Sequence, residues 1–257
     1  MKVTVCQLND HREPFKRDWG YLVEEVNREG SDLVVLPEMP FADWLMINPE
    51  PNLAAWNIAV EAHDSAIAAL LPQLGKATVL ATQPANDQGN RFNRGFLWSA
   101  ETGLQTAHDK TYLPDEEGVW EASWYHRGPV SFECIQAAGA RVGFQICTEM
   151  WFGECARAYG KQGAQIIASP RATGAPSLDK WLAGGRALAI MAGAFGLSSN
   201  RVNLPGVFPE FGGMGWIVDP DGQVLASTDH ERPAVTSEID LKIADHAKTT
   251  YPRYVIE

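Results

Sequence analysis

The feature that most constrains the fold is a short apolar run that comes directly after an amphipathic helix pattern. Between Phe15 and Val26, apolar residues recur at helical spacing, and Gly30 suits the end of that helix. The run Leu33–Leu36 that follows is continuously apolar, which is typical of a strand covered on both faces. Pro37 ends it, because proline cannot donate a hydrogen bond to a neighbouring strand. A strand buried on both sides predicts an α/β fold.

The alternation of strand and helix patterns continues along the chain. The further expected elements are strands at Val3–Leu8, Ala77–Ala81, Gln165–Ala168 and Leu197–Asn200, helices at Leu53–Leu71, Phe152–Gly160 and Leu178–Phe195, two strand pairs between residues 91 and 147, and a hairpin turning at residues 220–222. No linker, repeat or low-complexity tract interrupts the sequence, so we expect a single domain over residues 1–257. Strands flanked by amphipathic helices favour an α/β sandwich.

Composition and charge exclude several classes of partner. The net charge of −11 disfavours nucleic acid and anionic membrane surfaces, which are bound by clustered Lys and Arg. No apolar stretch is long enough to span a bilayer, and the first residues resemble a strand more than a secretory signal. The four cysteines form no CxxC pair or regular disulfide framework, which predicts a reduced, cytoplasmic setting.

Three polar residues come at the ends of predicted strands. Glu38 closes LVVLPE, Lys110 closes LQTAHDK and Cys147 closes VGFQIC. Each has an ordinary interpretation, as a loop carboxylate, a solvated turn lysine or an inert buried thiol. However, ligands of α/β proteins gather beyond the carboxyl ends of strands, so the three groups are expected to converge on one pocket.

The segments DLVVLPEMPF, HDKTYLPDEEGVWEASWYHRG and VGFQICTEMWFGECARAYGKQGAQIIASP resemble the signature segments of the nitrilase (carbon–nitrogen hydrolase) superfamily. The resemblance extends over nearly the whole chain. It implies a four-layer α-β-β-α sandwich and a catalytic triad of Glu38, Lys110 and Cys147. A second family glutamate matches Glu121, with Glu117 as the competing choice.

The chemistry implied is hydrolysis of a small amide through a thioester on Cys147, with no metal and no cofactor. Glu38 would take the thiol proton, while Lys110 and the backbone N–H of Thr148 would stabilise the oxyanion. Two carboxylates against one ammonium predict a protonated thiol at rest and a lysine that keeps its charge.

Rival functions find less support in the sequence. A papain-like Cys–His pair would need His108 or His126, neither of which has a recognisable local context. The spacings HExxH, GxSxG and GxGxxG do not occur. A catalytically idle scaffold of the same superfamily would normally lose one triad residue, and all three are present.

The substrate is constrained only broadly. Thr148-Glu149-Met150 departs from the CWE of true nitrilases, which favours an amide or, alternatively, an N-carbamoyl compound over a nitrile. Arg171 ends another predicted strand and either binds a substrate carboxylate or forms a structural ion pair. Four aromatic residues flank the expected site as pocket or core residues: Trp44, Trp120, Trp124 and Tyr125.

The superfamily also implies a homodimer or higher homo-oligomer. The C-terminal segment YPRYVIE (251–257) is aromatic and apolar enough to take part in such an interface.

Overall fold

A computed structural model describes residues 1–255 of the chain. Within this part, twelve strands form one continuous sheet that bends into two halves. The first half runs in the order β12 (Ala234–Glu238), β1 (Lys2–Asn9), β2 (Leu33–Val35), β3 (Thr78–Asp87), β4 (Asn90–Ser99) and β5 (Gly103–Asp109). The parallel strands β1, β2 and β3 form its centre, so their carboxyl ends lie at one edge.

The second half runs in the order β11 (Val224–Ser227), β10 (Trp216–Val218), β9 (Phe195–Val202), β8 (Ile166–Arg171), β7 (Ala140–Phe144) and β6 (Ile135–Ala137). Here β7, β8 and β9 are parallel. The end of β1 also pairs with the end of β9, between Gln7 and Asn200 among others, and this pairing joins the halves.

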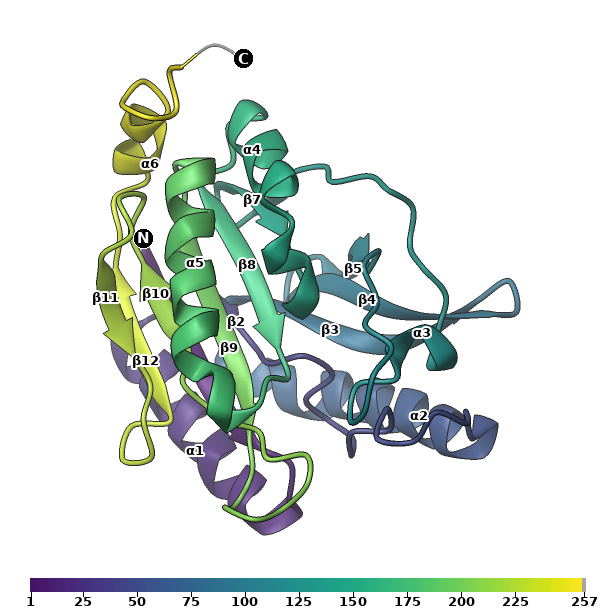
Figure 1. The fold of residues 1–257 in the computed structure, drawn as a ribbon. Helices are drawn as coiled ribbons and strands as arrows, with labels where there is room; N and C mark the ends of the chain where they lie inside the picture. The colour runs from purple at the N-terminus through teal and green to yellow at the C-terminus, as the bar shows by residue number, and fades with distance from the viewer. Residues whose placement is uncertain (256–257) are drawn as a thin grey trace.

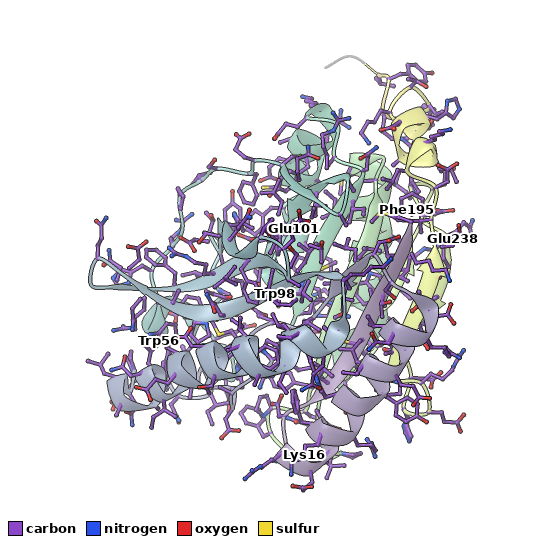
Figure 2. All side chains as sticks on the ribbon, turned by 180° about the vertical axis from the view of Figure 1, so that it is seen from behind. Lys16, Trp56, Trp98, Glu101, Phe195 and Glu238 are labelled. Carbon is purple, nitrogen blue, oxygen red and sulfur yellow. The ribbon has the colours of Figure 1, made fainter. Side chains whose placement is uncertain are left out.

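Helices cover the two outer faces of the molecule (Figure 1). On one side lie α1 (Arg12–Glu29) and α2 (Leu53–Leu70), and on the other lie α4 (Gly153–Lys161) and α5 (Leu178–Ala192). Figure 2 shows the face covered by α1 and α2, seen from behind. The shorter α3 (Glu121–Trp124) and α6 (Leu241–Ala247) lie outside these layers, and three 3₁₀ turns connect strands to helices: η1 (Leu71–Leu74), η2 (Cys147–Trp151) and η3 (Ala175–Ser177). No helix within residues 1–255 combines the length and apolar character needed to cross a membrane.

Three apolar clusters fill the spaces between these layers. The first lies between the two halves of the sheet and includes Val5, Leu33 and Phe144. A second packs α1 and α2 on the first half and includes Leu22 and Trp98, the latter labelled in Figure 2. A third packs α4 and α5 on the second half. Because two helix layers enclose two sheet halves, the clusters fit the four-layer order that the resemblance implied, and the α/β class is confirmed.

Most predicted elements are found within a few residues of their expected bounds. The observed β3 is longer than expected, because polar residues beyond the apolar run continue the ladder. The observed β9 is longer at both ends, and it includes Phe195, which was expected to end the preceding helix, because α5 stops at Ala192. One placement is wrong: Cys134 precedes β6 and is only half-buried, rather than lying within an apolar strand. Residues 256 and 257 of the proposed interface segment lie outside the described residues.

Candidate active site

The ends of two strands from opposite halves of the sheet meet at the centre of the molecule. The chain leaves β2 through Leu36 and Pro37, and the backbone N–H of Glu38 donates to the carbonyl of Arg171, 3.2 Å away, at the end of β8. The Glu38 side chain is fully buried there. The continuous apolar run of β2 therefore carries a carboxylate to the junction of the two halves.

Lys110 reaches the same junction from the end of β5. Its backbone N–H donates to the Asn93 carbonyl at 2.9 Å, which extends the β4–β5 ladder by one residue. Its Nζ donates to Glu38 Oε1 at 2.7 Å and to Glu121 Oε2 at 2.6 Å. Asn93 Nδ2 also donates to Glu38 Oε1 at 2.7 Å. A buried ammonium is thus held between two carboxylates.

The charges of this cluster depend on one another. Burial alone would lower the pKa of Lys110, but the attraction of Glu121 and then Glu38 outweighs it and raises that pKa, so the lysine is charged. Burial raises the pKa of Glu121 to about 7; Lys110 opposes this rise, whereas Glu38 adds to it. The expected retention of charge on the lysine agrees with this geometry.

Glu121, not Glu117, is the second carboxylate in contact with Lys110. Glu121 begins the short helix α3 and is buried, whereas Glu117 is exposed on the preceding loop. The Tyr125 hydroxyl donates to Glu121 Oε2, and burial followed by the charge of Glu121 raises the pKa of that phenol well above its usual value. Tyr125 therefore contacts the carboxylate rather than the open pocket.

Cys147 begins η2, and Gln145 and Ile146 separate it from the end of β7. Its φ of 50° places a non-glycine residue in the left-handed region, which costs about 1 kcal/mol or more and is common at functional turns. The side chain is 5 % exposed and lines a pocket of about 360 Å³. The other lining residues are Pro114, Glu116, Val119, Glu121, Thr148, Trp151, Ala172, Thr173, Gly174, Ser177, Lys180 and Trp181. A strained turn thus presents a thiol to a small cavity next to Glu121.

The Cys147 thiol is protonated in this arrangement. Burial is the main cause that raises its pKa above the ordinary value, and Glu38 adds to the rise. Lys110 lowers that pKa, but by less than burial and Glu38 raise it. The direction agrees with the expectation drawn from the charges, and it means that attack on a substrate requires a base.

Glu38 retains a free acceptor for such a proton. Within residues 1–255, its Oε2 is buried and has no hydrogen-bond partner, while its Oε1 accepts from Lys110 and Asn93. A buried carboxylate oxygen without a donor costs about 1–3 kcal/mol, and its lone pairs are not occupied by another protein group. Glu38 and Cys147 are also close enough to interact electrostatically.

Arg171 does not line the pocket: its guanidinium is buried, and each of its three nitrogens donates to a neighbouring group. It donates to Ser198 Oγ, Thr173 Oγ1 and the Met214 carbonyl at 2.6–2.7 Å and stacks on the Trp216 ring at 3.7 Å. Of the two readings left open by the sequence, this geometry favours a structural role, although the partners are neutral rather than acidic.

The predicted aromatic residues also lie outside the pocket. Trp124 is buried and donates its indole N–H to the Asn48 carbonyl at 2.6 Å. Trp44 donates to the Gly118 carbonyl at 3.0 Å, and both rings pack with Trp120 in one apolar cluster. This cluster packs against the short helix α3, which carries Glu121, while Trp151 and Trp181 line the pocket itself.

Sequence analysis did not identify Glu149 as a site residue. Its buried carboxylate accepts from the backbone N–H of Thr111 at 2.7 Å and from that of Ile146 at 2.8 Å. His108 Nε2 lies 2.9 Å from its Oε1. Thr111 follows Lys110 and Ile146 precedes Cys147, so one carboxylate joins the two segments. The contact with Thr111 joins residues that are 38 positions apart in the chain, so no local sequence pattern points to it.

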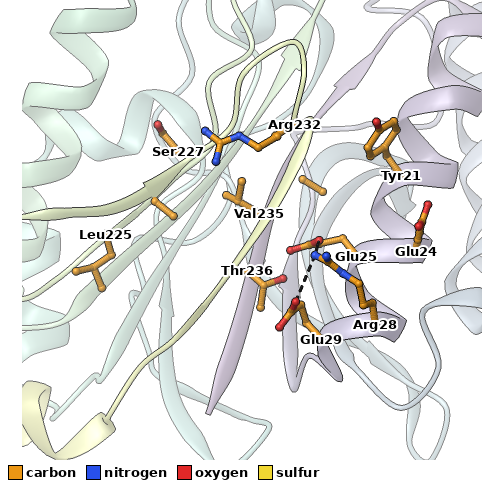
Figure 3. A pocket seen from close by; sticks show the side chains of 12 residues that line it. Tyr21, Glu24, Glu25, Arg28, Glu29, Leu225, Ser227, Arg232, Val235 and Thr236 are labelled. Atoms are coloured by element: carbon orange, nitrogen blue, oxygen red, sulfur yellow. Dashed lines mark hydrogen bonds and ion pairs between the residues drawn. The ribbon is translucent and has the colours of Figure 1, made fainter.

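A larger pocket of about 710 Å³ lies away from these residues, between α1 and the strands β11 and β12 (Figure 3). Its charged side chains largely pair with one another: Arg28 contacts Glu25 and Glu29. It contains no thiol, and no group of three potential metal ligands is found within residues 1–255.

The chain is similar to known carbon–nitrogen hydrolases. The family model described as "Carbon-nitrogen hydrolase" matches residues 2–249. A citrullinase from Francisella tularensis is 26% identical over 89% of this chain and 85% of its own length. An N-carbamoylputrescine amidase from Arabidopsis thaliana is 31% identical, but the match spans only 51% of this chain and 49% of the amidase. The crystal structure of a carbon–nitrogen hydrolase from Helicobacter pylori superposes with a TM-score of 0.85, at 21% identity, over 99% of this chain and 94% of that one.

Proposed function

Because the chain belongs to the carbon–nitrogen hydrolase family and is a hydrolase of amide or carbamoyl compounds, we propose that Cys147, Glu38, Lys110 and Glu121 perform this reaction. The observation that carries the proposal is the buried Lys110, held by Glu38 and Glu121 in electrostatic contact with Cys147. Lysine between two carboxylates supplies a fixed positive charge, and a carboxylate beside a protonated thiol supplies a base.

The proposed reaction begins with transfer of the Cys147 proton to Glu38 Oε2 as sulfur attacks the carbonyl carbon. Lys110 Nζ and the Thr148 backbone N–H stabilise the negative oxygen of the tetrahedral intermediate, each contributing about 3 kcal/mol. Glu38 then gives its proton to the leaving nitrogen, and a thioester remains on Cys147. Water deprotonated by Glu38 cleaves the thioester and restores the thiol.

The test is ammonia release from a panel of primary amides, ureido compounds and nitriles. Cys147→Ala is expected to lose release completely, while the matched Cys134→Ala, at a half-buried thiol outside the site, retains it. Glu38→Gln is expected to lower kcat by a factor of at least about 10³, because general-base catalysis and leaving-group protonation are both lost. Unchanged turnover in either Cys147→Ala or Glu38→Gln would refute the assignment.

N-carbamoyl hydrolysis is the second candidate, because both named relatives act, by their names, on carbamoyl compounds. Hydrolysis of a ureido group releases an amine and carbamate, which decomposes to ammonia and carbon dioxide, whereas an amide releases ammonia and a carboxylate. Measuring carbon dioxide together with ammonia separates the two. Equal molar amounts from a ureido substrate indicate the carbamoyl reaction.

Two further properties remain proposals. The exposed aromatic residues Tyr251 and Tyr254 support assembly into a homodimer or higher homo-oligomer, which light scattering of the purified protein tests directly. Absence of a disulfide among the four cysteines supports a reduced, cytoplasmic location. Fractionation of cells that express the tagged full chain tests that location.

A further inference from the structure

Five buried side chains next to the pocket are joined in a closed ring of hydrogen bonds. Lys110 Nζ donates to Glu38 Oε1 at 2.7 Å and to Glu121 Oε2 at 2.6 Å. Asn93 Nδ2 donates to the same Glu38 oxygen at 2.7 Å and, over a longer distance of 3.4 Å, to the Tyr125 hydroxyl. The Tyr125 hydroxyl donates its own proton to Glu121 Oε2, which closes the ring.

The chemistry of the groups determines the direction of every hydrogen bond in this ring. An ammonium and an amide nitrogen can only donate, and an ionised carboxylate can only accept. The Tyr125 oxygen therefore accepts from Asn93, while its one proton is used by Glu121. The ring uses two of the three hydrogens of the Lys110 ammonium. Among residues 1–255 the third has no acceptor, so it remains for the oxygen of a substrate.

The ring occupies one oxygen of each carboxylate and leaves the other. Both hydrogen bonds to Glu38 end on Oε1, and both hydrogen bonds to Glu121 end on Oε2. Glu38 Oε2 therefore stays without a partner within the described chain, and Glu121, which lines the pocket, can present Oε1 to a ligand. Without the ring, either carboxylate could rotate and exchange its two oxygens.

Packing alone does not explain the polar groups of Asn93 and Tyr125. Neither residue lines the pocket, so neither touches a substrate there. Tyr125 packs among aromatic residues, with its ring centroid 5.9 Å from that of Trp56, and a phenylalanine would fill the same space. Asn93 Oδ1 is buried and has no hydrogen-bond partner within residues 1–255, a cost that leucine would avoid. What the two polar groups add is their contact with the carboxylates.

We propose that Asn93 and Tyr125 are positioning residues, which close the ring around Lys110 and so fix the oxygen that each carboxylate turns toward the reacting groups. This inference rests on the proposed function for the roles of Glu38 and Glu121. The Asn93 carbonyl also accepts the backbone N–H of Lys110 at 2.9 Å, so one residue of β4 holds both the segment of the ammonium and the base.

Tyr125→Phe tests the ring through the pH profile. Burial raises the pKa of Glu121 to about 7 against the attraction of Lys110, Glu38 adds to the rise, and the hydrogen bond from Tyr125 opposes it. Protonated Glu121 no longer balances Lys110, so activity is expected to fall as the pH drops through this value. A donor stabilises the ionised carboxylate, so removing the donor raises the pKa further.

We therefore expect the acidic limb of kcat/KM in Tyr125→Phe to move up by about one pH unit, the size of one hydrogen bond to a charged group. Tyr21→Phe, at an exposed residue of α1, is the matched control and should leave the limb in place. A packing role alone would lower kcat/KM equally at every pH, so an unmoved limb in Tyr125→Phe would overturn the inference.

Asn93→Leu tests the other side of the ring. We expect kcat to fall about tenfold or more with little change in KM, because the residue holds Glu38 and lies outside the pocket. The melting temperature should change little, because the lost hydrogen bond is offset by removal of the unpartnered Oδ1. Asn27→Leu, at an exposed residue of α1, is the matched control. Tyr125→Phe carries the test alone if Asn93→Leu does not fold.

The double variant tests whether the ring is closed. If the two side chains act in one ring, Asn93→Leu combined with Tyr125→Phe should lose about as much activity as the more damaging single variant. Losses that multiply would show two independent contacts and overturn the ring.

The outcomes also separate this inference from the proposed function. Turnover that persists in Cys147→Ala would refute the function. Wild-type kcat and an unmoved acidic limb in the ring variants, with turnover lost in Cys147→Ala, would overturn the inference and leave the function standing. Alkylation of Cys147 by iodoacetamide adds an arm that needs no turnover. Its rate should fall in Asn93→Leu, because Glu38 takes the thiol proton, and an unchanged rate would also overturn the inference.

Discussion

Glu149 is the residue whose side chain joins the two segments of the candidate site that are far apart in sequence. Its two oxygens accept hydrogen bonds from the backbone on either side of the site, and His108 lies against both. Glu149 touches no substrate in the proposed mechanism, so it acts by positioning Lys110 and Cys147.

Replacing Glu149 with Gln keeps the shape but replaces one acceptor oxygen with an N–H₂ donor. That donor must face a donor at Thr111, Ile146 or His108, at a cost of about 1.5–3 kcal/mol in lost and opposed hydrogen bonds. We expect kcat to fall about tenfold or more with little change in KM, because the pocket lining does not include residue 149.

Steady-state kinetics and thermal unfolding check this expectation, with Glu154→Gln, an exposed substitution in the first turn of α4, as control. A Glu149→Gln protein that melts at a lower temperature but keeps the wild-type kcat would show a purely structural role.

The protonation of Cys147 gives a second prediction at this scale. Burial and Glu38 raise the pKa of Cys147, so its thiolate should be absent below about pH 9. The absorbance of the thiolate near 240 nm measures this, and subtracting the spectrum of Cys147→Ala assigns the signal to Cys147. Glu38→Gln removes one of the charges that raise the pKa, so its thiolate should form at lower pH. A wild-type thiolate that dominates at mildly acidic pH would contradict the proposed general-base step.

The site was only partly predictable from sequence, because strand ends are marked by local residues whereas the face to which a strand residue belongs is not. The three strand-end residues were found because Pro37 and the apolar runs mark where strands stop. The sequence leaves the role of Arg171 open. In β8, Arg171 lies on the same face as Ile167, which packs with α4 and α5, and on the opposite face from Ile166, which faces the other half of the sheet. The contact of Arg171 with Trp216 follows from that placement.

At the scale of elements, Gly128 allows the segment after α3 to return against β5. Its N–H donates to the Lys110 carbonyl at 2.9 Å, and an added Cβ would lie 2.0 Å from the Asp109 carbonyl oxygen. Backbone atoms block that position, so the contact cannot be relieved by rotating a side chain.

We therefore expect Gly128→Ala to destabilise the protein by about 1–3 kcal/mol, as overpacking does, and to lower activity by displacing Lys110. Gly20→Ala is the matched control: Gly20 lies in α1, an added Cβ meets nothing within 4 Å, and the substitution should stabilise by about 0.5–1 kcal/mol. Urea unfolding of both variants measures the difference. Equal effects of the two substitutions would show that this close approach does not limit stability.

The helices and central strands were predictable because their apolar patterns are long, as for α2, expected over Leu53–Leu71 and observed over Leu53–Leu70. The segment that carries Glu116 and the short helix α3 that carries Glu121 were not predictable, since their conformation depends on tertiary contacts such as the hydrogen bond of Trp44 to Gly118. Side-chain partners across the two halves of the sheet have no local sequence signal.

At the scale of the whole molecule, the buried His63 makes folding depend on pH. Burial is the main cause that lowers its pKa to about 4, although the Ala59 carbonyl lies 2.8 Å from Nδ1. The unfolded chain, with an ordinary histidine pKa near about 6.5, binds more protons than the folded protein between these values.

The contribution of neutral His63 to the free energy of unfolding is therefore complete above about pH 6.5. It is lost as the pH falls toward about 4, by up to about 3 kcal/mol. His63→Gln should flatten that part of the curve of unfolding free energy against pH, measured by urea unfolding at several pH values. An unchanged slope between the variant and the wild type would exclude His63 as the cause.

The unpaired Oε2 of Glu38 has a consequence for the evolution of the chain. Selection for folding alone would place a hydrogen-bond donor beside that oxygen, just as Asn93 and Lys110 donate to Oε1 of the same carboxylate. An oxygen without a donor at the centre of the fold lowers conformational stability but stays available for the proposed transfer of the Cys147 proton. Substitutions that supply a donor there are therefore expected to raise thermal tolerance and to lower turnover.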